Sequence, residues 1–286
     1  MKVPQKIRDN TRNFRQMFWA RRNFTNWLEI WTSMVLEREL PPLKTRQGNF
    51  ILSHAAIDQP LFLYREMFGP CDYLTDGFYK PTTDDTVVDI GANIGFFAHR
   101  LLLENSNIVV HCFEPVSSTR ERLLTNVSNN RSTASVHVYP FAVSRSRGEG
   151  YIQLTDSSLR AKMVNSSNRG AELIQCITLS DALHLCEPVN RIALLKIDTE
   201  GSEVDILSGA DKTDWGRIDR VALEYHDNLR PGSKTACLSI LESLRFSLFR
   251  LKECENGTGV ILACSQRLFR VNSLRNGPNE FGTSLF

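Results

Sequence analysis

The stretch that decides the fold is Val87-Val88-Asp89-Ile90-Gly91-Ala92-Asn93-Ile94-Gly95. Residues 86–90 form an apolar run with one acid near its end, a pattern typical of a strand buried on both faces of a parallel sheet. Gly91 and Gly95 bracket a tight turn, and apolar residues at helical spacing follow it. Strand, glycine turn and helix together predict the first half of a nucleotide-binding unit. The turn lets backbone approach a ligand closely, and the helix start offers free N–H groups.

The residues of this turn and of the following strand distinguish between classes of nucleotide ligand. A dinucleotide fingerprint reads G-x-G-x-x-G, but Asn93 and Phe96 stand at the second and third glycine positions, and no G-x-x-x-x-G-K-[ST] loop is present for a phosphate. Asp89, where strand meets turn, is suited to the ammonium of an amino-acid moiety. Glu114 ends a second predicted strand, 108–113, where a carboxylate holds ribose hydroxyls. An amino acid joined to a nucleoside without phosphates describes S-adenosylmethionine; the alternative is an ordinary βαβ unit with a solvent-facing Glu114.

Composition narrows the class of protein. The 286 residues allow one large α/β domain with an extension, and a net charge of +2 argues against nucleic acid as the main partner. No apolar run approaches the length of a transmembrane helix, and the N-terminus lacks the apolar core of a secretory signal. Seven scattered cysteines without a C-x-x-C pair fit reduced thiols, so a cytoplasmic location is expected.

The N-terminal part reads as an extension over residues 1–80. Residues 1–22 are rich in Lys and Arg, which predicts either a basic arm for an anionic partner or a solvated helix face. An amphipathic helix follows, ended by Pro41-Pro42, and it should be buried against the main domain or against a second copy in a homodimer. Its apolar stripe is Phe24, Trp27, Leu28, Trp31 and Val35.

Short elements connect this helix to the glycine turn. Residues 43–53 predict a hairpin turned at Gln47-Gly48, and residues 60–68 predict a helix. The extension is expected to make substrate or dimer contacts. Three aromatic residues before the turn either roof the cofactor or seal the domain edge; they are Tyr73, Phe78 and Tyr79.

The domain proper is assigned to residues 81–270, with a polar tail over 271–286. Further strands are predicted at 136–141, 173–178, 192–197 and 221–225, with an added strand at 151–154 and a closing antiparallel hairpin at 246–251 and 259–263. Residues 155–173 are polar and predict a long surface loop, either a lid or an insertion. Two helix starts are also predicted: Ser117 or Ser118 caps a helix carrying Leu123 and Leu124, and Ser202 forms a capping box with Asp205.

Alternating strands and helices predict a parallel sheet covered on both faces, with ligands at the carboxyl ends of its strands. Four acids fall at such predicted ends: Asp89, Glu114, Asp198 and Glu224. In an extended strand Lys196, Asp198 and Glu200 point the same way, and Glu224 shares a face with His226. These side chains are therefore expected to form one site.

The sequence resembles the FkbM family of S-adenosylmethionine-dependent methyltransferases. The matching stretches are VVDIGANIGFF at 87–97, FEP at 113–115, FAVS at 141–144, ITLSDAL at 177–183, LLKIDTEGSEVDILSGA at 194–210 and LEYH at 223–226. The resemblance implies the Rossmann-like seven-stranded methyltransferase sheet, mostly parallel with the last strand antiparallel. It also implies O-methylation of a hydroxyl on a sugar, glycolipid or other natural product.

Residue roles follow as expectations. Asp89 and the turn backbone of Gly91, Ala92, Asn93 and Gly95 are assigned to the amino-acid end of the cofactor S-adenosylmethionine. Glu114, followed by Pro115, is assigned to the ribose, and Phe141 and Ala142 are assigned to the adenine. The general base is one of Asp198, Glu200 and His226, of which His226 has the most suitable intrinsic pKa. Lys196 and Glu224 are assigned to the substrate, with Lys196 paired to Asp198 or Glu224. No metal is favoured, although Asp198 and Glu224 offer oxygen ligands to a divalent ion.

Three classes of function stay open at this stage. The first is an O-methyltransferase for a small molecule or carbohydrate. The second is a nucleic-acid or protein methyltransferase that uses the basic arm, which the near-neutral net charge disfavours. The third is a binding module that kept the fold without catalysis, which the complete set of acids disfavours.

Overall fold

The computed structural model describes residues 15–55, 59–130, 136–154, 161–164, 171–186, 191–254 and 256–268. The start of the basic arm, most of the predicted loop between 155 and 170, and the 271–286 tail lie outside the described residues. Within the described part of the chain, no helix is long and apolar enough to cross a bilayer.

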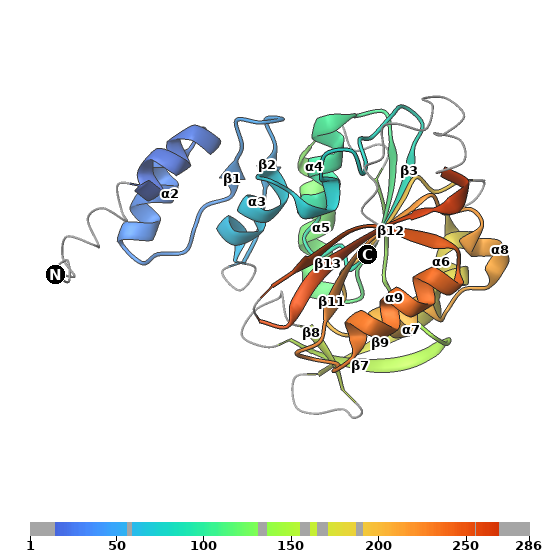
Figure 1. The fold of residues 1–286 in the computed structure, drawn as a ribbon. Helices are drawn as coiled ribbons and strands as arrows, with labels where there is room; N and C mark the ends of the chain where they lie inside the picture. Colours follow the sequence, from blue (N-terminus) through green and yellow to red (C-terminus); the bar gives the residue numbers. More distant parts are fainter. Residues whose placement is uncertain are drawn as a thin grey trace, which may run out of the picture.

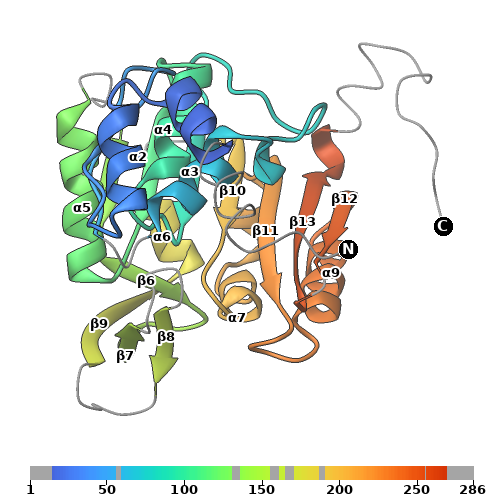
Figure 2. The ribbon, with the colours of Figure 1, turned by 90° about the vertical axis from the view of Figure 1, so that its left-hand side faces the viewer.

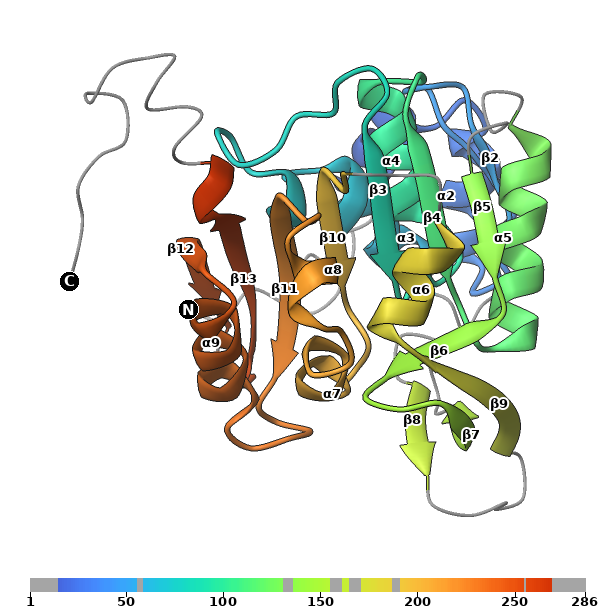
Figure 3. The same ribbon diagram turned by 90° about the vertical axis from the view of Figure 1, so that its right-hand side faces the viewer.

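A seven-stranded sheet forms the centre of the molecule, in the order β12-β13-β11-β10-β3-β4-β5 (Figure 3). Every neighbouring pair is parallel except those of β13, which runs antiparallel to both β11 and β12. The predicted sheet with a reversed last strand is therefore confirmed. Its strands are β3 (Thr86–Ile90), β4 (Val109–Phe113), β5 (Val136–Tyr139), β10 (Leu194–Ile197), β11 (Arg220–His226), β12 (Phe246–Glu253) and β13 (Thr258–Ser265).

Helices cover both faces of this sheet, as Figures 2 and 3 show from opposite sides. One face carries α3 (Pro60–Phe68), α4 (Phe96–Glu104) and α5 (Ser117–Asn129); the other carries α6 (Leu179–Leu185), α7 (Glu203–Leu207), α8 (Lys212–Trp215) and α9 (Ser233–Ser243). Successive strand residues alternate between the two resulting cores, so Val87 packs in one and Val88 in the other. Burial on both faces explains the continuous apolar run with which the fold begins.

A second sheet, in the order β6-β9-β7-β8, lies beyond the carboxyl ends of the parallel strands (Figure 3). Its strands are β6 (Phe141–Ser144), β7 (Gly148–Leu154), β8 (Ala161–Val164) and β9 (Ala171–Thr178). The strand predicted at 136–141 is confirmed over β5 but is wrong at its end, because Phe141 belongs to β6 of the other sheet and Pro140, which lacks an N–H donor, separates the two strands. The predicted 155–173 loop is also wrong in part, since β8 and the start of β9 fall inside it.

Two predicted caps are wrong, because no serine side chain caps the start of α5 or α7. The N-cap of α5 is Val116 without a side-chain bond, and Glu172 accepts from the Ser117 N–H at 2.9 Å. Ser202 is the N-cap residue of α7 but makes no side-chain bond there, and the neighbouring Glu203 accepts from the Gly201 N–H at 2.7 Å. On α5, Leu123 is buried and Leu124 is exposed.

The N-terminal part consists of a helix over residues 15–23, α2 (Trp27–Val35), the predicted hairpin β1 (Leu43–Lys44) with β2 (Ile51–Leu52), and α3 (Figure 1). The predicted apolar stripe is partly wrong, because the chain turns at residues 24–26. Phe24 is fully buried but precedes α2, Ile30 is the buried residue of α2, and Leu28 and Val35 are exposed. A contact of this exposed face with a second copy stays a prediction.

Two asparagines attach the hairpin to α5. Asn126 accepts from the Ser53 N–H at 2.5 Å and donates to the Ser53 carbonyl at 3.0 Å. Four residues on, Asn130 makes the same pair of bonds to Ile51, at 2.9 and 3.3 Å. These side-chain amides satisfy the backbone groups of β2 as a neighbouring strand would. The extension and the sheet consequently share one hydrophobic core.

A buried ion pair joins the two central strands. Lys196 on β10 and Asp89 on β3 are register partners, and the Lys196 Nζ donates to Asp89 Oδ1 at 3.1 Å. The Asp89 side chain is 0% exposed and that of Lys196 is 2% exposed. A charge at such depth is tolerated only with its partner, because removing one member leaves the other uncompensated.

We therefore expect Asp89→Asn to lower the free energy of unfolding by about 3–5 kcal/mol. Urea denaturation followed by circular dichroism measures this, with Asp84→Asn as the control because Asp84 is an exposed aspartate two residues before the same strand. Equal stability of Asp89→Asn and wild type would show that the fold does not depend on this pair.

Candidate active site

A cavity of about 410 Å³ lies where β3, β4, β10 and β11 end, at the point where strand order reverses between β3 and β10. Most of the residues predicted for a site line it: Gly91, Ala92, Asn93, Glu114, Pro115, Phe141, Ala142, Lys196, Asp198, Glu200, Glu224 and His226. Asp89 and Gly95 do not line it.

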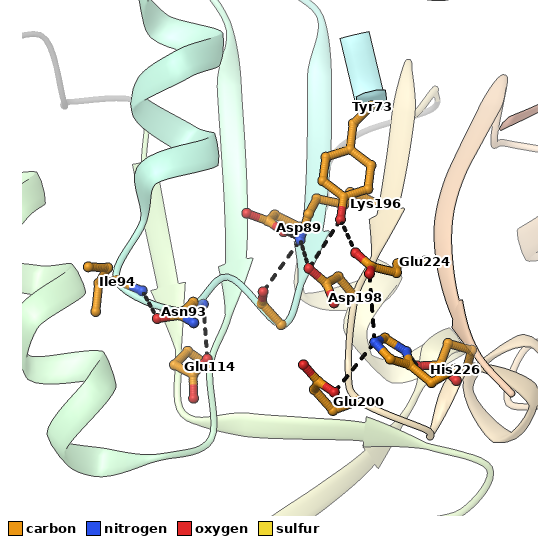
Figure 4. Close-up of polar contacts among 12 residues, drawn as sticks. Tyr73, Asp89, Asn93, Ile94, Glu114, Lys196, Asp198, Glu200, Glu224 and His226 are labelled. Atoms are coloured by element: carbon orange, nitrogen blue, oxygen red, sulfur yellow. Dashed lines mark hydrogen bonds and ion pairs between the residues drawn. The ribbon is translucent and has the colours of Figure 1, made fainter. Parts of the chain in front are cut away.

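One half of the cavity is organised by Glu114. Its carboxylate accepts from the Asn93 N–H at 3.0 Å (Figure 4). It also accepts from the Val116 N–H at 3.0 Å. Burial raises the pKa of Glu114 to about 7, against the opposing effect of these two N–H groups. The β3 turn and the end of β4 are thus joined through one carboxylate at the cavity wall.

The β3 turn has a demanding backbone. Gly91 has a φ of +79°, and a Cβ there would collide with the carbonyl oxygen of Asp198. Asn93 also adopts a left-handed conformation, with a φ of +49°, and its Oδ1 accepts from the Ile94 N–H at 2.7 Å. Glycine at 91 is therefore required by the approach of the β10 loop, whatever the ligand.

The wall beside Glu114 is apolar. Phe141, Ala142 and Val143 come from β6, and two further residues, Ile152 and Cys176, come from β7 and β9 of the second sheet. The second sheet was not foreseen from the sequence, so neither was the contribution of Ile152 and Cys176. The alternating apolar pattern of β9 was the available signal.

Asp89 occupies a different place from the one predicted. Its carboxylate is fully buried against Lys196 instead of facing the cavity, so direct contact with an amino-acid ammonium is not supported. The reason is the register of β3 and β10, which sets Lys196 opposite Asp89. Gly95 serves as the left-handed N-cap of α4, against Leu123.

The other half of the cavity gathers carboxylates around Lys196. Its Nζ lies 3.7 Å from Asp198 Oδ2, beneath the rings of Tyr73 and Phe97 at 5.3 and 5.5 Å. The Tyr73 hydroxyl lies 2.7 Å from Glu224 Oε2 and 3.2 Å from Asp198 Oδ2 (Figure 4). Burial, followed by the charge of Asp198, raises the pKa of Glu224 to about 7.

His226 faces carboxylates on both sides of its ring. Nδ1 is 2.9 Å from Glu203 Oε1, and Nε2 is 3.4 Å from Glu200 Oε2 and 3.8 Å from Glu224 Oε1. Burial lowers the pKa of His226, but the hydrogen bond to Glu203 and the surrounding charges outweigh burial and raise that pKa to about 9. This raised pKa favours the protonated ring at neutral pH, which does not favour His226 as the general base, and its catalytic role stays a prediction.

Glu200 does not share the strand face of Lys196 and Asp198 as predicted. β10 ends at Ile197, and Glu200 lies beyond it in a left-handed turn with a φ of +53°. A non-glycine residue held in this conformation carries strain, which tends to occur at functional sites. The turn directs Glu200 toward His226, and burial raises the pKa of Glu200 to about 7.

From the sequence, no polar role in the site was assigned to three residues that the structure places there. Glu66 on α3 lines the cavity, and burial, followed by the charges of Asp198 and Glu224, raises its pKa to about 7. Glu203 is the partner of His226, and Tyr73 bridges two acids. Tyr73 was noted only as one of three aromatic residues; the other two lie at the domain edge, Phe78 against Phe249 and Tyr79 on Asp85.

Lys196, predicted to pair with Asp198 or Glu224, is bonded first to Asp89 and lies near Asp198. Among the residues that the structure describes, no group of three His, Cys, Asp or Glu side chains is placed to hold a metal ion. Asp198 and Glu224 are instead linked through the Tyr73 hydroxyl.

Comparison with known proteins gives consistent matches. A model of the methyltransferase FkbM domain matches residues 89–251. The 31-O-demethyl-FK506 methyltransferase FkbM of Streptomyces tacrolimicus is 30% identical over 205 residues, covering 62% of this chain and 78% of the relative. The hexuronic acid methyltransferase AglP of Haloferax volcanii is 26% identical over 215 residues, covering 75% of this chain and 85% of the relative.

The fold is also matched by a solved structure. The methyltransferase FkbM of Methylobacillus flagellatus aligns with a TM-score of 0.50 at 16% identity, covering 89% of this chain and 60% of that one. The family match extends over more than half of the chain and includes the end of β3 and all of β4, β10 and β11, which build the cavity. The chain belongs to the FkbM family of methyltransferases.

Proposed function

We propose that the chain is an S-adenosylmethionine-dependent O-methyltransferase acting on a hydroxyl of a small molecule, a sugar or glycolipid, or a natural product. The observation that carries this proposal is a single cavity with two unlike halves. One half combines Glu114 with an apolar wall, and the other gathers ionisable side chains around Lys196 and His226. The volume lies in the range of small-molecule sites. Relatives named for methylating 31-O-demethyl-FK506 and a hexuronic acid support an acceptor of this size.

The residues of the first half fit the cofactor. Each oxygen of an ionised carboxylate accepts more than one hydrogen bond. Glu114 therefore keeps acceptor capacity for ribose hydroxyls beside the two N–H groups that it already binds. Phe141, Ala142 and Ile152 offer an apolar surface to the adenine, and the backbone of Gly91–Asn93 borders the same space, as does Pro115. The acids of the second half suit the positive charges of a sulfonium and an ammonium.

When bound, S-adenosylmethionine supplies a methyl group already activated by its positive sulfur. The protein must align the acceptor oxygen, exclude water and take up one proton. We assign the proton to Glu200, which lines the cavity and has a pKa near the operating range of a base. Asp198 and Glu224, held by Tyr73, are placed to bind the acceptor hydroxyls. Asp89 acts indirectly, by holding Lys196.

We also propose a role for the extension over residues 1–80, beside the methyltransferase domain over 81–270. Phe62, Glu66 and Met67 of α3 line the cavity, which supports α3 as the wall of the acceptor site. A cytoplasmic location is supported by the cysteines, all seven of which are free thiols.

The function itself is tested in two steps. Mass spectrometry of denatured purified protein should reveal S-adenosylhomocysteine, and a panel of hydroxylated compounds incubated with methyl-labelled cofactor should yield a labelled ether. Label appearing on nitrogen or on a macromolecule, with none on the panel, would contradict the proposal.

Replacing Glu114 tests the cofactor half. Glu114→Gln should weaken binding of S-adenosylhomocysteine by about 1.5–3 kcal/mol, because a charge-assisted hydrogen bond to the ribose is lost. In wild type the affinity should rise as pH increases through about 7, where Glu114 becomes ionised. Isothermal titration calorimetry measures both effects. Glu121→Gln, an exposed change on α5, serves as the control and should bind as wild type does.

Replacing Glu200 tests the base. With an acceptor from the panel, the wild-type rate should rise with pH through about 7, since Glu200 accepts a proton only when ionised. Glu200→Gln should lower kcat by about 10²–10⁴-fold and remove this limb while cofactor affinity holds. In His226→Gln the limb should move to higher pH, because the imidazolium lowers the pKa of Glu200. A wild-type limb near pH 9 that disappears in His226→Gln would instead make the histidine the base.

A further inference from the structure

Glu203 is a buried carboxylate to which the proposed mechanism gives no task. It is the first residue of α7 and is 0% exposed. Three donors surround it: the Gly201 N–H at 2.7 Å, the His226 Nδ1 at 2.9 Å and the Ser233 hydroxyl at 3.5 Å. A carboxylate so far from water requires such compensation, and its position at a helix start favours the negative charge further.

This environment determines the state of the histidine ring. A carboxylate only accepts hydrogen bonds when ionised, so Nδ1 of His226 carries a proton toward Glu203. The opposite nitrogen, Nε2, also faces acceptors, at 3.4 Å from Glu200 and 3.8 Å from Glu224. Carboxylate oxygens thus face both ring nitrogens, which favours the doubly protonated ring, and the bond at Nδ1 fixes the ring plane.

We propose that Glu203 is a positioning residue of the active site. It holds His226 as a fixed positive charge, with Nε2 directed between Glu200 and Glu224. The inference rests on the proposed function, in which Glu200 receives the proton of the acceptor hydroxyl as the carbon–oxygen bond forms and the carbon–sulfur bond breaks. His226 keeps its protons throughout and stabilises the ionised form of Glu200 before the reaction.

The groups around His226 support this division of roles. Glu203 faces it from α7, Glu200 and Asp198 from the turn after β10, and Glu224 from its own strand β11. Ser233 of α9 reaches the ring only through Glu203. Among these carboxylates Glu203 is completely buried and does not line the cavity, so it acts on the reaction from outside the cavity, through the groups that it binds, of which His226 carries a charge.

The test measures the histidine directly, in protein without cofactor or acceptor. Two-dimensional ¹H–¹⁵N NMR of the imidazole rings, assigned with His226→Gln, should show His226 doubly protonated at pH 7.5, with a pKa of about 9. Glu203→Gln keeps the shape but removes the charge, so the pKa of His226 should fall by about 1–3 pH units. Glu203→Asp, which keeps the charge, should recover part of that change.

The remaining histidines provide the internal control, since their signals should titrate alike in wild type and Glu203→Gln: His54, His99, His111, His137 and His184. Ser233→Ala, which touches Glu203 without removing a charge, should leave the His226 titration within about half a pH unit of wild type. With an acceptor, Glu203→Gln should move the rate limb to higher pH, because the histidine charge that lowers the pKa of Glu200 is weakened. In a His226→Gln background this upward shift should be absent.

Two results would overturn the proposal. A folded Glu203→Gln protein whose His226 titrates as in wild type would show that Glu203 does not hold the charge. If that variant fails to fold, the wild-type spectrum decides alone, and a neutral His226 ring at pH 7.5 would be enough to reject the proposal. If the NMR result is as expected but wild-type protein transfers no methyl group to the panel, that failure would instead count against Glu200 as the base.

Discussion

The rest of the structure depends on how one buried cation, Lys196, is compensated. Its ammonium binds Asp89 across the two central strands, approaches Asp198 at the strand end, and lies beneath the rings of Tyr73 and Phe97. These contacts connect the strand that begins the fold, the edge of the cavity and the N-terminal extension. Since an unpaired charge at this depth is costly, the position of each partner is constrained by the others. The register of the sheet therefore also determines how the charged residues of the site are arranged.

The charge balance of the cavity follows from this arrangement. Each cation is already engaged by a fully buried acid, Lys196 by Asp89 and His226 by Glu203. The cavity carboxylates are compensated only in part, and burial raises the pKa values of Glu66, Glu200 and Glu224 to about 7. A site with this balance takes up protons near neutral pH and favours ligands with positive charge. That preference suits a sulfonium cofactor and a base that must ionise before it acts.

Much of this could be predicted from the sequence. Residues 86–96 set the strand, turn and helix because their apolar period and glycines allow few alternatives, and the family resemblance fixed the reversed last strand. The local sequence did not reveal the second sheet, since Pro140 interrupts what reads as one strand. It also misplaced Asp89, whose partner is set by the pairing of β3 with β10, and His226, whose pKa depends on Glu203, distant by 23 residues. Such errors arise where charge partners come from different elements.

The division of the cavity between two parts of the chain bears on specificity. All residues proposed to hold the cofactor lie within the matched region, 89–251, whereas Phe62, Glu66 and Tyr73 precede it and lie against or beside the acid cluster. These residues belong to the N-terminal extension. Asn126 and Asn130 attach its hairpin to α5, and a shared hydrophobic core packs the extension against the sheet. If α3 forms the acceptor wall as proposed, substitutions on it would reshape that wall without touching Glu114. A family that conserves one methyl donor and varies its acceptors would place that variation here, where the scaffold is rigid but the cavity-facing side chains are not part of the cofactor site.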